Sequence, residues 1–163
     1  MKKELFYPLT IFAAAASVLF WLYMFQNGNA VEKPVNTFEK GEITLTMYHG
    51  EGCQCCVRWA DYLEDQGVKV INELIMNPNA FKNENGVPDQ LRSCHTAVVD
   101  DYIVEGHMPN QAIDKLLSEK PDIAGIALPG MPLGSPGMPG EKTEDWVIYA
   151  INHDGSYEEF MRL

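Results

Sequence analysis

The cysteines of this chain are clustered, since three of the four lie within four positions, at Cys53, Cys55 and Cys56. The preceding residues, 43–48, alternate in the manner of a β-strand, and the following residues, to about 66, predict a helix. The thiols are therefore expected at a strand-to-helix turn, where the positive end of the helix dipole favours thiolates. Thiolates both bind soft metals and attack disulfides, so the motif predicts one of these two chemistries.

The spacing of Cys53 and Cys56 leaves three interpretations open. Cys-x-x-Cys is the spacing of dithiol oxidoreductases, and it also suits a structural disulfide in an oxidising compartment. Cys55 favours the third interpretation, a soft-metal site, because a third thiol can form wrong disulfides in a redox centre but adds a ligand to a metal site. The metal site is therefore the leading hypothesis.

The hydrophobic pattern predicts an α/β domain with a thioredoxin-like order of elements. Strands are expected at 43–48, 68–71, 96–99, 102–105 and 146–151, a closing segment at 157–163, and helices at 55–66, 79–84 and 110–119. The cysteine motif then lies after the first strand and opens the first helix. Element order alone is a weak argument for function, so the hypothesis depends on the side chains that this order brings together.

Three details of these elements can be checked directly. Four side chains of the first helix are expected to face the core, namely Val57, Trp59, Ala60 and Leu63. Gly67 is expected to end that helix, and Asn110 to cap the start of the last one. The run 126–140 contains four prolines and four glycines and should exclude regular structure. Such a segment in a compact domain is usually functional or disordered.

The fourth cysteine, Cys94, is followed by His95 just before the predicted central strand. In a thioredoxin-like domain this turn faces the first cysteine motif, and in thioredoxins it carries a cis-proline. A thiol and an imidazole in place of this proline favour a metal-binding pocket over a groove that binds a substrate. The alternative is a disulfide between Cys94 and one of the other three cysteines, which would leave two free thiols.

Three further side chains could add ligands to the thiols. His107 lies in a turn before the last helix, where a lone histidine is more often a surface residue, but the neighbouring thiols favour a ligand role. Met131 and Met138 each follow Pro-Gly in a stiff loop that has no packing period to satisfy. Thioethers, thiolates and imidazole together select Cu(I), and clustered thiols can bridge more than one ion.

The amino terminus predicts export and membrane attachment. Lys2 and Lys3 precede residues 5–25, a run without charge that is long enough to span a bilayer. We expect a signal anchor at 1–26, a transmembrane helix in the inner membrane, followed by a linker at 27–41 and a metal-binding domain at 42–163. Gly28-Asn29-Ala30 is a candidate cleavage site, so a cleaved signal peptide is the alternative. Either case predicts a periplasmic domain.

Four segments in one order resemble the CopG-type periplasmic copper-resistance proteins. They are Cys-x-Cys-Cys followed by Trp, Gly-Val-Pro-x-x-Leu-Arg-Ser-Cys-His-Thr-Ala-Val-Val at 86–99, Glu-Gly-His-x-Pro at 105–109, and Pro-Gly-Met-Pro-x-Gly-Ser-Pro-Gly-Met at 129–138. The resemblance spans about 43–151. The chain departs from the family pattern at Gln54, where Gly is frequent, and at Met108, where Val is common; neither change removes a ligand.

The resemblance implies a thioredoxin-like fold and a role in copper tolerance, with Cu(I) held in a multinuclear cluster and a copper oxidoreductase activity as a further implication. Carried over by position, the sulfur ligands or bridges would be Cys53, Cys55, Cys56 and Cys94. The candidate outer ligands would be His107, Met131, Met138 and His95. The expected partners are copper ions, the inner membrane, and copper exporters or periplasmic copper chaperones.

Two other functions compete with copper binding. A membrane-anchored thiol–disulfide oxidoreductase would use Cys53 and Cys56, although the third cysteine and the missing cis-proline count against it. A disulfide-stapled interaction domain would hold all four cysteines in bridges. The net charge of −11 argues against nucleic acid as a partner, because phosphate binding needs clustered Lys and Arg. No catalytic acid or base stands out, so enzymatic turnover stays open.

Overall fold

The computed structural model describes residues 43–163. The predicted signal anchor at 1–26 and the linker at 27–41 lie outside the described residues. Within 43–163, none of the helices combines the length and the apolar character needed to cross a bilayer.

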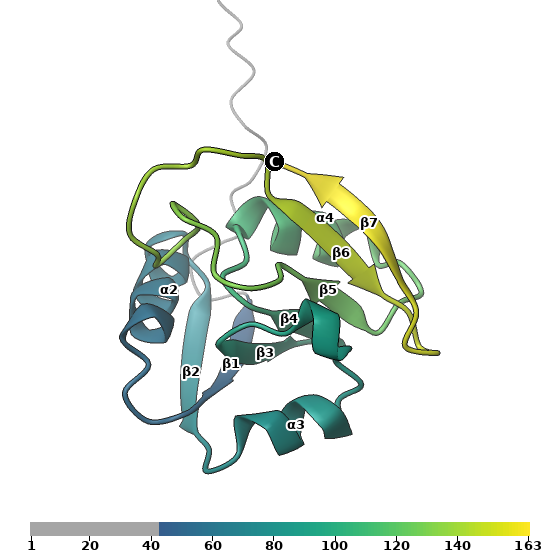
Figure 1. Cartoon of the computed structure of the whole chain (residues 1–163), viewed down its shortest axis with the longest axis horizontal. Coiled ribbons are helices and arrows are strands. Elements are labelled where there is room, and N and C mark those ends of the chain that lie inside the picture. Colours follow the sequence, from purple (N-terminus) through teal and green to yellow (C-terminus); the bar gives the residue numbers. More distant parts are fainter. Residues whose placement is uncertain (1–42) are drawn as a thin grey trace, which may run out of the picture. The chain divides into compact units, whose positions relative to one another are not determined.

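The described residues form a mixed α/β structure with one sheet, which confirms the predicted class (Figure 1). In chain order the elements are β1 (Thr44–His49), α2 (Gln54–Asp65), β2 (Lys69–Leu74), α3 (Pro78–Glu84), the 3₁₀ turn η1 (Asp89–Leu91), β3 (His95–Val99), β4 (Tyr102–Glu105), α4 (Asn110–Glu119), β5 (Gly125–Ala127), β6 (Val147–Ile151) and β7 (Tyr157–Arg162). The seven strands of this part of the chain lie in the order β2-β1-β3-β4-β5-β6-β7.

The strand directions bring the ends of β1 and β3 together. β2 runs parallel to β1, because α2 connects them as a crossover, whereas β3 is antiparallel to β1. In that pairing His49, the last residue of β1, lies opposite His95, the first residue of β3. The turn after β1 and the turn before β3 therefore meet at one edge of the sheet.

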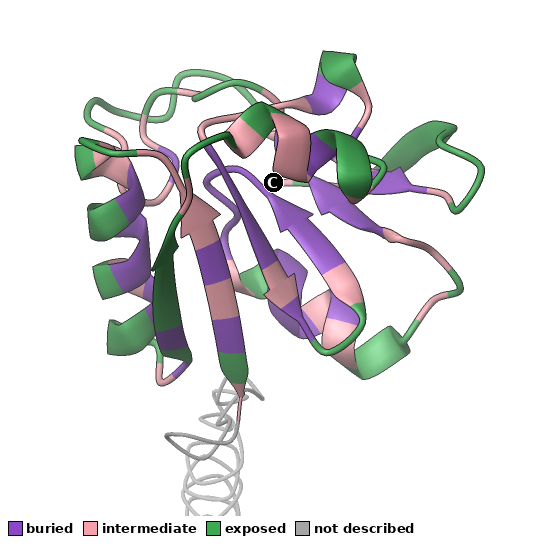
Figure 2. Ribbon diagram, turned by 90° about the horizontal axis from the view of Figure 1, so that it is seen from below, coloured by how far each residue is buried: buried purple, intermediate pink, exposed green. Residues whose placement is uncertain are grey.

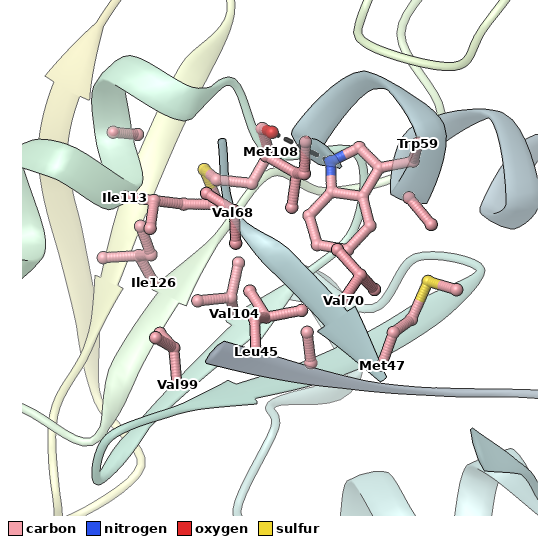
Figure 3. Packing of buried hydrophobic residues seen from close by; sticks show 14 of the residues in the cluster. Leu45, Met47, Trp59, Val68, Val70, Val99, Val104, Met108, Ile113 and Ile126 are labelled. Atoms are coloured by element: carbon pink, nitrogen blue, oxygen red, sulfur yellow. Dashed lines mark hydrogen bonds between the residues drawn. The ribbon is translucent and has the colours of Figure 1, made fainter. Parts of the chain in front are cut away.

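The core fills the space between the sheet and two helices, α2 and α4. Trp59 of α2 is fully buried there, and its indole N–H donates to the backbone oxygen of Met108 at 2.9 Å (Figure 3). Met108 is itself buried among core side chains, which favours its role as a filler of space over that of a ligand. The α2 face that carries Trp59 is thereby fixed against the segment leading into α4.

The prediction for Val57 was wrong, because its side chain is 45% exposed. The buried residues of α2 recur at helical spacing: Cys56, Trp59, Ala60 and Leu63. Val57 falls one residue outside this stripe and faces outward. Figure 2 shows that the helices bury one side and expose the other. The motif cysteine Cys56 takes the core position instead.

Two predicted helix ends had different outcomes. Gly67 follows α2 with φ of 94°, a left-handed conformation that glycine adopts readily, so this prediction is confirmed. Asn110 does not cap α4, since the cap position belongs to Pro109 and the Asn110 amide donates to Asp114 within the helix at 3.1 Å. Pro109 is in an extended conformation, so the cap lies one residue earlier than predicted, whereas the helix spans the predicted residues, Asn110–Glu119.

The region 126–140 contains more regular structure than expected. Gly125–Ala127 form β5, which pairs in parallel with β4 and antiparallel with β6. Ile126 and Ala127 precede the first proline, Pro129, and their backbone groups are therefore available to the ladder. The prediction excluded strand structure here and was wrong for these residues. The proline-rich segment proper begins after β5.

The opposite face of the sheet is covered by α3 (Figure 1). Phe81 of α3 stacks on Tyr48 of β1 with ring centroids 4.3 Å apart. Side chains alternate between the two faces along a strand, so Tyr48 points toward α3 while Met47 lies in the core beneath α2. The two layers of helices enclose the edge of the sheet at which the cysteines lie.

Candidate metal centre

The four cysteines converge at this edge of the sheet. Cys53 is the residue before α2, Cys55 and Cys56 lie in its first turn, and Cys94 immediately precedes β3. The sulfur of Cys94 is 3.6 Å from that of Cys55 and 3.6 Å from that of Cys56. The sulfurs of Cys53 and Cys55 are also 3.6 Å apart. The predicted approach of Cys94 to the first motif is therefore confirmed.

Cys53 and Cys56 form a disulfide, whereas Cys55 and Cys94 are free thiols. The Cα atoms of the disulfide are 5.3 Å apart, as the Cys-x-x-Cys spacing at a helix start allows. The alternative pairing of Cys94 with one of the other cysteines does not occur. Because thiolates are the form that binds a metal, reduction of the disulfide must precede any site that uses all four sulfurs.

His107 is buried and joins the sulfur cluster from the segment after β4. Its Nε2 atom is 2.8 Å from the sulfur of Cys94, and its Nδ1 atom is 2.7 Å from the backbone oxygen of Pro136. A carbonyl oxygen can only accept, so Nδ1 donates and the Nε2 lone pair of the neutral ring faces the sulfur. Burial lowers the pKa of His107, which favours the neutral, ligating form. A second partner that fixes the ring in this way is common among metal-binding histidines.

His95 is fully buried and packs on Trp59 with ring centroids 4.4 Å apart. Its Nδ1 atom is 3.5 Å from the sulfur of Cys94, and within residues 43–163 its Nε2 atom has no hydrogen-bond partner. Burial holds the pKa of His95 well below its usual range, so the ring is neutral. The ring nitrogen that faces the Cys94 sulfur is Nδ1, and a neutral imidazole nitrogen beside thiols is a ligand that suits copper. The donor set thus fits copper.

Two groups of ligand atoms share Cys94. The four cysteine sulfurs lie within 4.8 Å of one another, and so do the ligand atoms of Cys94, His95 and His107. Burial, followed by the hydrogen bond to Cys55, raises the pKa of Cys94 to about 12. The Cys94 thiol is therefore protonated at neutral pH in the metal-free protein, and a metal ion must displace this proton when it binds.

The proline-rich loop at 129–140 lies against the start of α2. Gly137 has φ of 80°, and a Cβ atom there would be 2.7 Å from the backbone oxygen of Cys55. Arg58 of α2 donates from Nε to the Gly137 oxygen at 2.8 Å. Only glycine permits so close an approach. Met138, which is partly buried, is the next residue of the loop and therefore lies beside this contact with α2.

Met131 lies at the other end of the same loop, and its side chain is 52% exposed. The preceding Gly130 is held by two contacts to the segment that leads to Cys94. Its N–H donates to the Arg92 oxygen at 3.2 Å, and its own oxygen accepts from the Ser93 hydroxyl. The structure thus ties both ends of the loop to cysteine-bearing segments, while the ligand roles of the two methionines stay predictions.

A charged pair beside the site was not predicted from the sequence. Lys82 of α3 and Glu105 of β4 are both buried, and the Lys82 Nζ atom is 2.5 Å from Glu105 Oε1. Glu105 belongs to the Glu-Gly-His-x-Pro segment, so the sequence held a signal for it. Lys82 stands in a short polar helix with no signal that could have revealed its burial.

Comparisons with known proteins place this site in a described family. A family model described as protein of unknown function, DUF411, matches residues 91–138, which include Cys94, both site histidines and both loop methionines. No curated protein sequence matches the chain.

Two solved structures, both of a copper resistance protein named CopG, are similar to the chain. Form 2 shares 35% identity with a TM-score of 0.70, covering 74% of this chain and 98% of that one. Form 1 shares 35% identity with a TM-score of 0.69, covering 74% of this chain and 97% of that one. Identity at this level over nearly the whole length of both structures leaves one assignment: the chain belongs to the CopG family of copper resistance proteins.

Proposed function

We propose that this protein binds Cu(I) in the bacterial periplasm and serves copper resistance. The observation that carries the proposal is the convergence of the four cysteine sulfurs within 4.8 Å of one another, in a chain similar to structures named copper resistance protein CopG. Thiolates, neutral imidazoles and thioethers are soft ligands that select Cu(I) among the available ions. Zinc would have no need of methionine.

The fold assignment is part of the proposal. The strand order β2-β1-β3-β4, with α2 between the parallel strands and α4 after the hairpin, corresponds to the thioredoxin-like core. In that core the first helix starts at the site, so its dipole supports the negative charge of thiolates. β5, β6 and β7 extend the sheet beyond this core.

Cys94 is the best candidate for a bridging ligand, because its sulfur lies 3.6 Å from two other sulfurs and 2.8 Å from a histidine nitrogen. A thiolate in this position can contact more than one ion, which supports a thiolate-bridged multinuclear cluster. His95 and His107 would supply nitrogen donors, and Met131 and Met138 outer thioethers. Since copper is redox-active, cycling between its oxidation states belongs to the same proposal.

The sequence supports the proposed location and partners. Residues 1–26 would anchor the protein in the inner membrane, and residues 42–163 would hold the metal in the periplasm. Copper exporters or periplasmic copper chaperones are the expected partners for delivery or transfer. A cleaved signal peptide would leave the same metal-binding domain free in the periplasm.

A thiol–disulfide oxidoreductase is the second candidate. The disulfide between Cys53 and Cys56 at the start of α2 favours it, since this is where dithiol enzymes place theirs. The free thiols of Cys55 and Cys94 beside that disulfide count against it. They could exchange with it and trap wrong pairings.

The stoichiometry of Cu(I) binding tests the proposal. The protein is reduced, freed of reductant and titrated anaerobically with Cu(I) against a chromogenic chelator. We expect more than one tightly held Cu(I) per chain, and a loss of binding in the double variant Cys53→Ser/Cys56→Ser. Met161→Leu, in strand β7, is the control and should bind as the unmodified protein does. Less than one Cu(I) per chain, together with efficient reduction of insulin disulfides, would favour the oxidoreductase.

A further inference from the structure

A buried polar network lies on the α3 face of the sheet, opposite the core. Lys82 donates from Nζ to Glu105 Oε1 at 2.5 Å and to Thr96 Oγ1 at 2.9 Å. Thr96 in turn donates to Glu105 Oε2 at 2.6 Å. The side chains of Lys82 and Glu105 are 3% and 0% exposed. The network thus contains a buried ion pair, and the hydroxyl of Thr96 in β3 forms a hydrogen bond with each of its two members.

Two partners of Glu105, Ser93 and Thr96, are sequence neighbours of candidate ligands. The backbone N–H of Ser93 donates to Glu105 Oε1 at 2.6 Å, and Ser93 directly precedes Cys94. Thr96 directly follows His95, and it lies opposite Glu105 in the pairing of β3 with β4. The Glu105 carboxylate therefore accepts hydrogen bonds from the residues on both sides of the Cys94–His95 segment.

Glu105 is also only two residues from His107, with Gly106 between them. The Gly106 N–H donates to the His95 oxygen at 3.0 Å. A Cβ atom on Gly106 would be 2.5 Å from the Leu128 oxygen and 2.7 Å from Ser93 Cβ, so the Gly106 backbone packs directly against the Ser93 side chain. Glu105 is therefore linked by its carboxylate to the Cys94 segment and by its backbone to the His107 segment.

The pair is a poor device for stability alone. Replacing a buried ion pair by apolar side chains of similar volume is often neutral or stabilising, because the cost of desolvating the two charges cancels most of their attraction. Its hydrogen bonds, in contrast, specify a geometry that apolar contacts would not. The network is therefore better suited to fixing the positions of the segments it joins than to stabilising the fold.

We infer that Lys82 and Glu105 are positioning residues, which hold Cys94, His95 and His107 in the arrangement that binds Cu(I). The inference rests on the proposed copper-binding function and deepens it. Lys82 lies outside residues 91–138, the segment that the family model matches, and it reaches the site only through the fold. It contacts Thr96 and Glu105, and so acts on the metal through them.

The test compares three variants of the reduced protein. Lys82→Met removes the charge but keeps the length of the side chain. Lys82→Met/Glu105→Gln leaves no unpaired charge and offers the Ser93 N–H only a neutral amide oxygen, which is a weaker acceptor than the carboxylate. Lys115→Met is the matched control, because Lys115 also lies 2.5 Å from a glutamate, Glu119, but on the exposed surface of α4. Each variant is checked for folding by circular dichroism and thermal unfolding.

Three readouts then separate positioning from a merely structural role. Competition with a chromogenic Cu(I) chelator gives the affinity, and amide hydrogen exchange in the metal-free protein reports on residues 93–96. In the folded double variant we expect about 10- to 100-fold weaker Cu(I) binding and faster exchange at Ser93, with Lys115→Met unchanged in both. The nitrogen contribution to the copper X-ray absorption spectrum should fall in parallel.

The outcomes that would overturn the inference are distinct from those that concern the function. A folded double variant with the affinity and exchange of the unmodified protein would overturn it. A double variant that no longer folds would also overturn it, since the network would then serve the fold itself. If the unmodified protein binds no Cu(I), the proposed function fails and the inference fails with it.

Discussion

At the scale of single residues, Cys94 is the most informative position, because both ligand groups include it. Its sulfur contacts the sulfurs of Cys55 and Cys56 and the ring of His107. The same burial that brings these groups together raises the pKa of Cys94 to about 12. The residue is thus a poor nucleophile without metal, whereas a Cu(I) ion that displaces its proton makes it a strong ligand.

The raised pKa makes a prediction about thiol reactivity. A pKa that moves from 9.0 to about 12 lowers the thiolate fraction at pH 8 by about a thousandfold, and alkylation proceeds through the thiolate. Iodoacetamide should therefore label Cys94 far more slowly in the native metal-free protein than in denaturant. The rate should rise about tenfold per pH unit between pH 7 and 9. Mass spectrometry of the labelled peptides measures this, and equal rates in native and denatured protein would contradict it.

At the scale of elements, the loop at 129–140 depends on its contact with α2. On one side of the loop, Arg58 donates a hydrogen bond to the Gly137 oxygen, and Gly137 packs against the backbone of Cys55. On the other side, His107 donates to the Pro136 oxygen. The loop thereby fixes the tautomer of a candidate ligand as well as carrying the two methionines. We therefore expect the contact between this loop and α2 to be needed for a complete metal site.

The glycines of this loop allow a controlled test of docking. Gly137→Ala combines an unfavourable left-handed conformation with a Cβ 2.7 Å from backbone atoms of Cys55 and Trp59. Gly130→Ala has the same conformational cost, but its Cβ meets nothing within 4 Å. We expect Gly130→Ala to destabilise the fold by about 1 kcal/mol. Gly137→Ala should cost about 1–3 kcal/mol more and also weaken Cu(I) binding.

Denaturant unfolding and chelator competition on both variants provide the measurement. If Gly137→Ala and Gly130→Ala gave the same stability and the same copper affinity, the loop would not dock on α2 in solution.

At the scale of the whole molecule, the site lies at the end of the sheet where β1 ends and β3 begins. Side chains from both faces of the sheet contribute to it. Trp59 and His95 support it from the core side, and Lys82 and Glu105 from the α3 side. The amino-terminal 26 residues, which lie outside the described part, would tether this domain to the membrane. The metal would then be held close to the inner membrane, where exporters and chaperones could exchange it.

Cell fractionation tests the proposed tether. The full chain should be found in the membrane fraction, and residues 42–163 behind a cleavable signal peptide should be found in the soluble periplasmic fraction. Amino-terminal sequencing of the mature protein is the companion measurement. A mature chain that begins at Val31 would refute the anchor and support the cleaved signal peptide.

The comparison of sequence with structure separates local from long-range information. The helix α4, the stop at Gly67 and the turn between β3 and β4 could be predicted because their signals lie within a few residues. The meeting of Cys94 with the first motif followed from the order of the elements. Each of these predictions used spacing and residue type alone.

The predictions that were wrong, and the pair that was missed, depend on packing. Val57 was assigned to the core although the stripe that packs on the sheet passes beside it. Ile126 was assigned to an irregular loop although two strands pair with it. Lys82 has a sequence context typical of a surface residue, and only the tertiary fold supplies its partners, Thr96 and Glu105. Such burial has no local signal.

The central claim is a Cu(I) site built on cysteine sulfur. X-ray absorption at the copper edge, on the reduced protein reconstituted anaerobically, tests it most directly because it reports the oxidation state and the ligand atoms together. We predict Cu(I) with mainly sulfur ligands, a smaller nitrogen contribution from histidine, and a short copper–copper distance from bridging thiolates. A spectrum of copper bound only by nitrogen and oxygen would contradict the claim.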